Sequence, residues 1–451
     1  MNGRKANLGW LLLVNAVYAL AALVGWPAYL VLLALRRKYR RRCWQRWGFV
    51  PRLPLALPRF WIHAISVGEV EAARTFIPAL AKAYPEADLV ISTTTLTGRE
   101  RAERLFPQCR VFHFPLDLAP CVHLALRRIQ PTAVIQVESE WWPNFFLLAR
   151  RRGVPVMVVN ARMTERSARR YRLIRPLMRA VLNSCACIAV QAQVYADRLL
   201  SLGADPERVS VTGQMKHDGV LFADTIPAAE DLRERMQIEA GAAVIVAGST
   251  GPGEEPILLD AFREVRRWNP RARLVIVPRR PESFEPAAQA ILRAGMGLAR
   301  RSASDVWRGP KDLPPVLLGD TMGELMKWYA LADVVVVGRS LVRLGGSNPM
   351  EPGGLGKALL WGPHMFNFPE EAREMLAEGA AREVADAGAL ARALEELLTD
   401  APRRREMGEA ARRVIRRLQG ATPRNIRLVC EAVPGSAGGT SRREYRAGEM
   451  P

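Results

Sequence analysis

Glu69 is the acidic residue whose surroundings in the sequence best suit it to take part in chemistry. The apolar run of residues 61–65 predicts a strand, Ser66-Val67-Gly68 predicts a turn, and a helical pattern follows. Glu69 therefore lies at a helix start, where backbone N–H groups lack partners and an acid complements the helix dipole. If the strand belongs to an open parallel sheet, Ser66, Gly68 and Glu69 also lie at the sheet edge where such folds bind ligands.

Two more acids, Glu138 and Glu140, follow the predicted strand 132–137. Alternate residues of a strand point to the same side, so the two carboxylates converge if the strand continues through them. Close carboxylates push one pKa upward, which suits an acid/base residue or an orienting pair. A solvated turn above packed tryptophan side chains explains the same segment equally well, and the sequence leaves both explanations open.

Basic side chains dominate residues 150–179, in which Glu165 is the single acid. A solvated helix face is the ordinary explanation of such a stretch, but like charges repel unless an anionic group approaches them. Arg162 lies at the end of a predicted strand within it. Lys216 follows another predicted strand near the expected domain junction, where a lysine can stabilise negative charge on a leaving phosphate or an attacked sugar.

Two segments of the second half of the chain suit a phosphate ligand. Residues 248–255, which include Ser249 and Thr250, form a glycine-rich turn between a strand and a helix. Such turns cradle phosphates in many proteins, and in others they serve simply as turns. Pro278 and Arg279 directly follow a predicted strand, and a guanidinium group there can grip phosphate.

Two further helix starts carry candidate ligand contacts. The first is Met322-Gly323-Glu324, and the second is a glycine loop followed by Asn348-Pro349-Met350-Glu351. The proline suits a first helical turn, the positive end of the helix favours an anionic group, and Glu351 can accept hydrogen bonds from ribose hydroxyls. The sequence contains no Walker P-loop, and no GxGxxG follows the first strand, which disfavours ATP hydrolysis and ordinary NAD chemistry.

The composition indicates two domains and an anionic partner. The chain has 451 residues, a formal net charge of +20 and a pI near 10.5. This charge suits nucleic acid, an acidic membrane surface or phosphorylated substrates. The sequence lacks zinc-finger spacing, RNP-like motifs and basic zippers, so we expect no nucleic-acid partner. Its six cysteines form no CxxC pair and its five histidines no metal-ligand pattern, so we expect neither a metal nor a cofactor.

Residues 10–35 form an apolar segment without a charged side chain, preceded by a short flank, residues 1–9. As a helix the segment would span about 39 Å at about 1.5 Å per residue, enough to cross roughly 30 Å of hydrocarbon. Residues 36–59 form a basic and then proline-rich juxtamembrane linker. We expect a single-pass transmembrane anchor with the following domains in the cytoplasm and anionic lipids at the basic cluster. A monotopic hairpin bent at Pro27 is the alternative.

Short apolar strands alternate with helical segments over the rest of the chain. One half has predicted strands at 61–65, 88–93, 110–114, 132–137, 154–159, 186–190 and 208–212, and the other at 243–248, 272–277, 315–318, 333–337 and 358–361. Uniformly apolar strands are typical of parallel sheets covered on both faces. We predict an α/β protein of two doubly wound, Rossmann-like domains facing a cleft, residues 60–216 and 241–433, joined by a linker region at 217–240. Residues 434–451 form a polar tail that we expect to be disordered.

Several motifs together resemble those of the bacterial Kdo transferases, which attach 3-deoxy-D-manno-octulosonic acid (Kdo) to lipid A precursors. The matching segments are residues 63–69, 93–95 with 97–98, 138–144, 159–162, 319–325, 348–352, and 362–364 with 367–368. The resemblance implies a GT-B fold, CMP-Kdo as donor, the lipid A precursor lipid IVA as acceptor, no catalytic metal and inversion at the anomeric carbon. It also implies a place in lipopolysaccharide inner-core synthesis at the bacterial inner membrane.

The resemblance also assigns roles to single residues. Glu69 matches the general base, and Glu138 and Lys216 match positions that stabilise the transition state. The CMP-binding segments match Pro278, Arg279, Met322, Gly323, Glu324, Asn348, Pro349, Met350 and Glu351. Ser66, Gly68, Glu140, Arg162, Ser249 and Thr250 are possible additional site residues. Four positions depart from the family pattern, in which histidine is common at the positions of Gly251, Arg280 and Ser347 and glycine at that of Arg339.

Two other functions are open from the sequence. One is a GT-B transferase that carries another nucleotide sugar to a lipid acceptor. The other is a non-catalytic membrane protein that binds a nucleotide sugar or anionic lipid. The motifs do not fix how many Kdo residues are added, because mono-, bi- and multifunctional members of the family share them.

Overall fold

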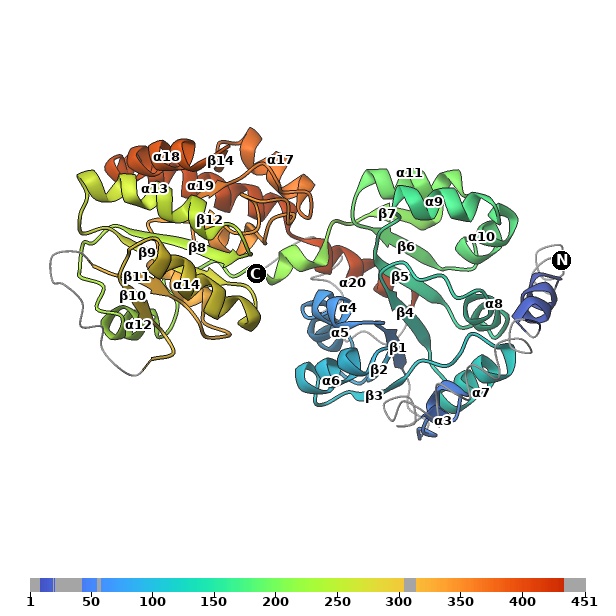
Figure 1. The fold of residues 1–451 in the computed structure, drawn as a ribbon. Coiled ribbons are helices and arrows are strands. Elements are labelled where there is room, and N and C mark those ends of the chain that lie inside the picture. The colour runs from blue at the N-terminus through green and yellow to red at the C-terminus, as the bar shows by residue number, and fades with distance from the viewer. Residues whose placement is uncertain (1–8, 19, 21–42, 55–57, 304–313, 434–451) are drawn as a thin grey trace. The chain divides into compact units, whose positions relative to one another are not determined.

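The computed structural model describes residues 9–18, 20, 43–54, 58–303 and 314–433, and its contacts divide the chain into two units. Unit 1 comprises residues 1–219 and 419–451, and unit 2 comprises residues 220–418. Each unit has one parallel sheet with helices on both of its faces (Figure 1). The predicted α/β class and the doubly wound organisation of both halves are confirmed.

The sheet of unit 1 has seven strands in the order β3-β2-β1-β4-β5-β6-β7. They are β1 (Arg59–His63), β2 (Asp88–Thr93), β3 (Arg110–His113), β4 (Ala133–Val137), β5 (Val156–Ala161), β6 (Cys187–Val190) and β7 (Val209–Val211). The chain places β2 and β3 on one side of β1 and then returns to place β4 on the other. The strand order therefore reverses between β1 and β4.

Burial on both faces explains why these strands are uniformly apolar. In β4, Val134 packs into one core cluster, whereas Ile135 and Val137 pack into the cluster on the opposite face. The rings of Trp61 in β1 and Phe145 meet in the first cluster with centroids 5.0 Å apart. Because each strand is held from both sides, the residues that follow it start from a fixed position.

The helices of unit 1 connect these strands. They are α3 (Cys43–Arg46), α4 (Val67–Ala72), α5 (Phe76–Ala83), α6 (Leu96–Leu105), α7 (Ala119–Ile129), α8 (Pro143–Arg151), α9 (Glu165–Arg172), α10 (Arg175–Leu182), α11 (Gln193–Ser201), the 3-10 turns η1 (Pro206–Arg208) and η2 (Met215–Gly219), and α20 (Ala421–Ala432). The helical pattern that follows the turn at residues 66–68 is divided into two separate helices, α4 and α5. Thr75, which lies between them, shares a hydrogen bond with Thr422 of α20 at 2.9 Å.

The last helix, α20, belongs to unit 1, although the sequence analysis assigned residues 241–433 to the second domain. It packs against α5, and Asp218 Oδ1 accepts the backbone N–H of Gly420 at 2.6 Å. The Nε–H of Arg424 donates to the Thr212 carbonyl at 2.7 Å. The expected end of the second domain is therefore wrong, because an amphipathic pattern shows which face of a helix is buried but not which unit buries it.

Unit 2 also has a seven-stranded sheet, in the order β10-β11-β9-β8-β12-β13-β14. Its strands are β8 (Val244–Thr250), β9 (Arg273–Pro278), β10 (Leu298–Arg300), β11 (Val316–Leu318), β12 (Val334–Val337), β13 (Ala358–Trp361) and β14 (Ala381–Glu383). The strands β10 and β14 were not predicted. Both lie at sheet edges and have three residues each, with charged side chains among them.

The helices of unit 2 begin within the expected linker region. They are α12 (Ala229–Arg235), α13 (Glu255–Trp268), η3 (Pro281–Ser283), α14 (Phe284–Arg293), α15 (Leu325–Leu331), α16 (Met350–Gly354), α17 (Pro369–Ala377), α18 (Ala387–Thr399) and α19 (Ala401–Leu418). Helix α12 packs against α15, so the region 217–240 is largely part of unit 2 rather than a free connection.

Part of the expected anchor is helical and contacts unit 1. Residues 9–18 form a helix in which Leu11 and Val14 are buried. Asn15 Nδ2 donates to Asn144 Oδ1 at 2.9 Å, and Asn15 Oδ1 accepts the N–H of Ala119 at 3.1 Å. A search of the described ranges finds no helix with the length and hydropathy to cross a membrane. Residues 21–35, the basic residues 36–42 and the tail 434–451 lie outside the described residues.

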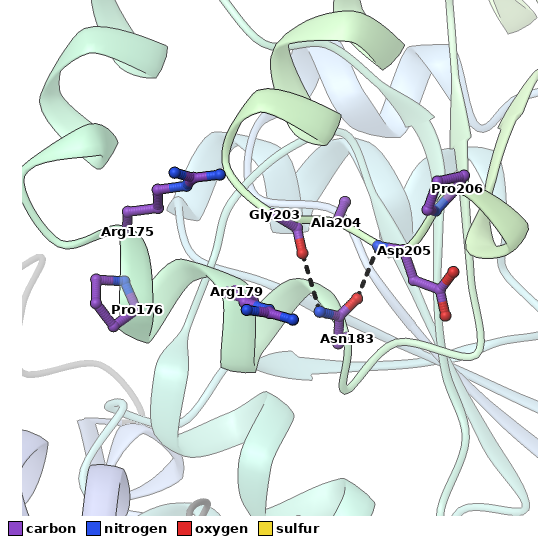
Figure 2. Close-up of a pocket in the computed structure, with 8 residues that line it drawn as sticks. All are labelled: Arg175, Pro176, Arg179, Asn183, Gly203, Ala204, Asp205 and Pro206. Atoms are coloured by element: carbon purple, nitrogen blue, oxygen red, sulfur yellow. Dashed lines mark hydrogen bonds between the residues drawn. The ribbon is translucent and has the colours of Figure 1, made fainter.

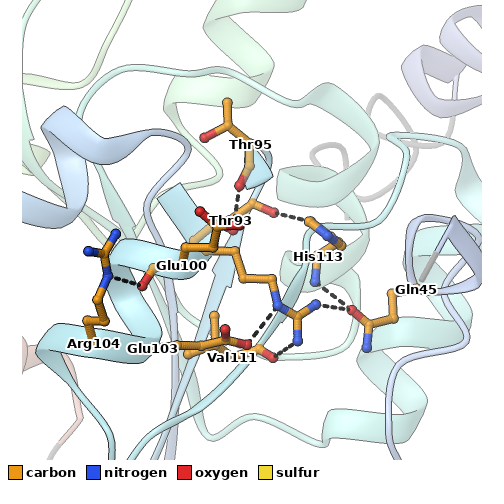
Figure 3. A network of polar contacts seen from close by, with 9 residues as sticks. Gln45, Thr93, Thr95, Glu100, Glu103, Arg104, Val111 and His113 are labelled. Atoms are coloured by element: carbon orange, nitrogen blue, oxygen red, sulfur yellow. Dashed lines mark hydrogen bonds and ion pairs between the residues drawn. The ribbon is translucent and has the colours of Figure 1, made fainter. Parts of the chain in front are cut away.

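The residues that follow the basic cluster are fixed to the sheet of unit 1, not free as a linker would be. Gln45 Oε1 accepts hydrogen bonds from Arg99 Nη1 and from the backbone of His113, both at 3.0 Å (Figure 3). The side chain of Arg46 donates to the Thr94 carbonyl at 2.7 Å. The Thr94 N–H in turn donates to the carbonyl of Ile65 at 3.1 Å. Helix α3 is thereby connected to the loop that leads from β1 into α4.

Candidate active site

Glu69 lies in the first turn of α4, directly after β1, and Ser66 is the N-cap residue of that helix. The carboxylate accepts the backbone N–H of Ile65 through Oε2. It therefore complements the start of the helix, as expected for an acid in a first helical turn. Gly68 is exposed in the same turn. Among the described residues no cation forms a salt bridge with Glu69, in contrast to Glu71, which pairs with Arg101.

Glu138 follows β4, the neighbour of β1 at the reversal of strand order. Open α/β sheets bind ligands outside the carboxyl ends of their strands at such a reversal. Of the two explanations that the sequence left open, the continued strand does not hold, because β4 ends at Val137, as predicted, and Glu138 has a φ of 62°. Both acids nevertheless lie near enough to Glu69 for their charges to act on it.

The pKa of Glu69 is the clearest electrostatic feature of this edge. Burial raises it from 4.5 to about 7, the hydrogen bond from Ile65 opposes the shift, and the charges of Glu138 and Glu140 reinforce it. Burial also raises the pKa of Glu140. A carboxylate with a pKa near the working pH is well matched to accept a proton during catalysis.

Arg162 and Lys216 are connected to the same edge through backbone contacts. The Arg162 N–H donates to the hydroxyl of Ser139, which stands between the two acids after β4, at 2.7 Å. Asn160, with a φ of 57°, accepts the N–H of Met215 through Oδ1 at 3.0 Å. This bond fixes η2, which carries the exposed Lys216 and contacts α4. The structure thus gathers the predicted residues of unit 1 on loops at one edge of its sheet.

In unit 2 the order of strands reverses between β8 and β12, and two of the predicted donor residues, Pro278 and Arg279, lie at the end of β9, the neighbour of β8. Ser249 and Thr250 end β8. The Arg279 N–H donates to the Thr250 carbonyl at 3.0 Å, and the Ser347 hydroxyl donates to the Ser249 carbonyl at 3.0 Å. Arg279 and the loop before α16 therefore meet at the end of β8.

The glycine-rich turn at 248–255 does not offer its N–H groups to a phosphate. The N–H of Gly251 donates to Glu254 Oε2 at 2.8 Å, and that of Gly253 donates to Glu255 Oε2 at 3.0 Å. The phosphate-cradling explanation is wrong for these two groups, because carboxylates of the same turn already occupy them.

Glu254 is a functional candidate that the sequence analysis missed. Its side chain is fully buried, and besides Gly251 it accepts the backbone N–H groups of Arg339, Ser340 and Leu341 at 2.6, 2.9 and 3.0 Å. Burial raises its pKa, while these hydrogen bonds oppose the shift. The one signal in the sequence was an acid pair directly after the glycine turn.

Arg279, Arg280 and Arg339 form a group of cations at this edge. Burial lowers the pKa of Arg339, and the charges of Arg279 and Arg280 lower it further. Arg339 has a φ of 63°, a conformation that favours glycine, which is the residue of the family pattern. A Cβ on Gly251 would stand 3.2 Å from Arg339 Cγ and 2.5 Å from Leu344 Cδ1, so a larger residue there requires these two side chains to shift. The departures at 251 and 339 are therefore neighbours in space.

The loop before α16 is held by its own polar side chains. Asn348 accepts the N–H of Met350 through Oδ1 at 3.1 Å and donates through Nδ2 to Glu351 Oε1 at 3.2 Å. Burial raises the pKa of Glu351, and the bond from Asn348 and the charge of Arg279 oppose the shift. The predicted helix is confirmed, with Pro349 at its N-cap, although α16 has only five residues.

Met322, Gly323 and Glu324 lie after β11, which β9 separates from β8. The hydroxyl of Thr321 donates to Glu324 Oε2 at 2.6 Å, and Arg301 and Lys327 form salt bridges with the same carboxylate. Burial acts to raise the pKa of Glu324, but these partners hold it below its ordinary value. The Glu324 carboxylate is thus held by three side chains of unit 2.

A family model described as 3-Deoxy-D-manno-octulosonic-acid transferase (kdotransferase) matches residues 41–219. The 3-deoxy-D-manno-octulosonic acid transferase of Haemophilus influenzae is 34% identical over 396 residues, which are 87% of this chain and 91% of that protein. The chain belongs to the Kdo transferase family. The enzyme of the same description from Bordetella pertussis is 35% identical over 384 residues, covering 83% of this chain and 87% of its own.

The fold of this Kdo transferase is similar to that of a solved glycosyltransferase from Rickettsia africae, with a TM-score of 0.57 at 13% identity. The match covers 84% of this chain and 99% of the other. Together with the two parallel sheets, it supports the predicted GT-B fold. Family membership also makes the chain a glycosyltransferase. Within the described ranges no three His, Cys, Asp or Glu side chains gather as metal ligands would, and metal independence stays a prediction.

Proposed function

We propose that the protein transfers Kdo from CMP-Kdo to the lipid A precursor lipid IVA, in lipopolysaccharide inner-core synthesis, by an inverting and metal-independent reaction. Two relatives that match over most of their length are Kdo transferases, which supports this donor and acceptor. The observation that carries the mechanism is the position of Glu69 after β1, at the reversal of strand order, with a pKa near 7.

Glu69 acts as the general base in this proposal. Its carboxylate takes the proton of the primary hydroxyl on the lipid, and the hydroxyl oxygen forms a bond to the anomeric carbon of Kdo. The bond from that carbon to the phosphate oxygen breaks, and CMP leaves with the electron pair. Attack opposite the leaving group inverts the anomeric centre. Glu138 and Lys216, which lie on loops at the same edge, stabilise the charge that develops.

The cations of unit 2 receive the donor. Both CMP-Kdo and the departing CMP are anionic, which suits the group formed by Arg279, Arg280 and Arg339. Asn348 and Glu351 present an amide and a carboxylate that can bond nucleoside hydroxyls. Holding donor and acceptor in one orientation supplies much of the acceleration. The place of the reaction is the cytoplasmic side of the bacterial inner membrane, with residues 10–35 as a single-pass anchor and anionic lipids at the basic cluster that follows.

Mass spectrometry tests the proposed donor and acceptor. The full chain in lipid nanodiscs is incubated with lipid IVA and either CMP-Kdo or a UDP-hexose. The proposal expects lipid IVA carrying one or more Kdo residues with CMP-Kdo alone, and the product masses count the additions. Transfer from the UDP-hexose with none from CMP-Kdo would establish a different glycosyltransferase. Binding of CMP without any product would favour a non-catalytic membrane protein.

A further inference from the structure

The turn between α9 and α10 exposes two apolar side chains to solvent. Leu173 is 86% exposed and Ile174 is 45% exposed, although both are aliphatic. The inward side chains of α10, Met178, Val181 and Leu182, are buried, so the helix itself is firmly packed. The exposed pair is therefore a protruding apolar tip on a rigid support.

Arginines surround this tip. Glu165 pairs with Arg169 and Arg198, but five exposed arginines of α9 and α10 form no salt bridge with any described carboxylate: Arg166, Arg170, Arg172, Arg175 and Arg179. Uncompensated like charges around an apolar tip favour a partner that is both anionic and able to take up hydrocarbon. An anionic bilayer surface meets both requirements.

A pocket beside the tip can take an anionic head group. It has a volume of about 780 Å³, and Arg175 and Arg179, one helical turn apart on α10, both line it (Figure 2). The stem of Arg179 lies against Gly203, where a Cβ would stand 3.1 Å from its Cγ. Asn183 donates to the Gly203 carbonyl at 3.0 Å and accepts the N–H of Asp205 at 2.8 Å, which fixes this wall of the pocket.

The one acid that lines the pocket does not cancel its charge. The carboxylate of Asp205 forms a salt bridge with Arg208 at 3.3 Å, so the acid has its own cation. The pocket also contains Pro176, Ala204 and Pro206, which offer no charge. The two guanidinium groups of α10 therefore set the sign of the pocket, and a phosphate group is the chemistry that fits them.

A second element points to the same partner. In the helix of residues 9–18, Leu12, Leu13 and Val17 are 66, 53 and 56% exposed, while the opposite face is bonded to unit 1. That helix contacts α8 through Asn144, and α10 also packs against α8. Helix α8 thus contacts both elements that expose apolar side chains, the helix of residues 9–18 and α10. The helix of residues 9–18 includes the start of the apolar segment 10–35.

We propose that the α9–α10 turn is a second membrane contact of unit 1, which docks on an anionic phospholipid bilayer. Leu173 and Ile174 enter the interfacial layer, and Arg175 and Arg179 bind the phosphate of an anionic lipid head group. This inference rests on the proposed function, in which the acceptor is a membrane lipid, and it adds the surface that keeps unit 1 at that membrane. A nucleic acid would occupy the arginines but would leave the aliphatic tip in water.

An environment-sensitive fluorophore tests the depth of the tip. The full chain with Leu173→Cys is labelled and placed in nanodiscs of phosphatidylethanolamine and phosphatidylglycerol, or of phosphatidylcholine alone. We expect a blue-shifted emission that spin-labelled lipids quench in the anionic discs, and a weaker effect in the neutral discs. Leu292→Cys on α14, exposed by 51%, is the matched aliphatic control and should report water in both. The unsubstituted chain measures background labelling of its six cysteines.

A double variant tests the arginines. Each basic residue near an anionic surface contributes a factor of about five to the equilibrium constant for docking of the turn on the bilayer. Arg175→Gln with Arg179→Gln should therefore sharply reduce the quenching of the label at position 173 in anionic discs. Arg263→Gln with Arg267→Gln on α13 removes two charges from the same formal +20 and should leave docking unchanged. Equal effects of the two double variants, or a label at 173 that reports water in anionic discs, would overturn the proposal.

The same samples are assayed for Kdo transfer, so that the two proposals fail separately. A water-exposed label in a sample that transfers Kdo removes the docking surface and leaves the function. A quenched label in a sample that makes no product from CMP-Kdo removes the proposed function and leaves a membrane-docking unit.

Discussion

Glu254 accepts the backbone N–H of Arg339 at 2.6 Å, and this hydrogen bond ties the loop after β8 to the loop after β12. The carboxylate holds three further N–H groups, so one buried acid fixes both loops at the reversal of strand order in unit 2. Arg339 keeps a left-handed backbone conformation at φ 63° under this constraint. The cations proposed to receive the donor therefore depend on a residue that need not touch the donor.

Replacing this acid should loosen the donor site. Glu254→Gln puts an amide NH2 group among backbone donors, and each donor left unpaired in a buried site costs about 1–3 kcal/mol. We expect a lower free energy of unfolding of that order in urea titrations, and a KM for CMP-Kdo that rises more than kcat falls. Glu255→Gln is the control, because the Glu255 carboxylate accepts one backbone N–H of the described residues, that of Gly253, at 3.0 Å. Equal losses in both variants would contradict a special role for Glu254.

Arg339 should strengthen donor binding through its charge and weaken the fold through its strained backbone conformation. In Arg339→Gly the left-handed conformation becomes easy, so we expect an unfolding free energy that is unchanged or higher by about 1 kcal/mol. Loss of a charge-assisted contact of about 1.5–3 kcal/mol should raise the KM for CMP-Kdo by roughly ten- to a hundredfold. Isothermal titration with CMP provides the affinity directly. Arg343→Gly, an exposed arginine of the same loop, should leave the affinity unchanged, and a parallel loss there would reject the assignment.

The rate should depend on pH through Glu69. Its pKa lies near 7 in the folded chain, and only the ionised carboxylate can accept a proton. We therefore expect kcat/KM to fall by about tenfold per pH unit well below pH 7. The raised pKa also means that folding disfavours the ionised form, so Glu69 lowers the free energy of unfolding as the pH rises from 4.5 to about 7, and the loss is complete above that range. Glu69→Gln should consequently be at least as stable as the parent at pH 8 in thermal unfolding.

Glu140 should tune that dependence. Its negative charge contributes to the raised pKa of Glu69, so Glu140→Gln should move the acidic limb of the kcat/KM profile to lower pH. Glu165→Gln, on the exposed α9, is the control and should leave the limb in place. An unchanged or upward-shifted limb in Glu140→Gln would show that this charge does not act on the base.

Much of the fold could be predicted from the local sequence pattern, and the elements that were missed or misplaced have physical explanations. The central strands of both sheets were predicted within two residues of their observed ends, because burial on two faces makes them continuously apolar. The edge strands β10 and β14 were not predicted, because each pairs with only one neighbouring strand of the described sheet and has three residues, one or more of them charged. The place of α20 in unit 1 depends on contacts with α5 and residue 218, which no local pattern encodes.

The sequence predicted which site residues follow strands, but not which of them lie close together. Spacing placed Glu69 and Glu138 after strands, but their neighbourhood arises from the pairing of β1 with β4. The sequence left open whether the strand continues to Glu140, and it does not, because Glu138 adopts φ 62°, which the sequence alone does not signal for a glutamate. Likewise, the glycine turn at 248–255 suggested a phosphate cradle, but Glu254 and Glu255 accept the N–H groups of Gly251 and Gly253, which depends on side-chain positions that the turn pattern does not encode.

The central claim is that one carboxylate accepts the proton of the lipid hydroxyl, and single-turnover Kdo transfer at pH 8 tests it most directly. Glu69→Gln is compared with Glu71→Gln, the same change two residues later in α4, where the acid pairs with Arg101. General-base catalysis contributes about 10²- to 10⁴-fold, so we predict a loss of that size for the first variant and near-parent rates for the second. Near-parent transfer by a folded Glu69→Gln protein would contradict the account.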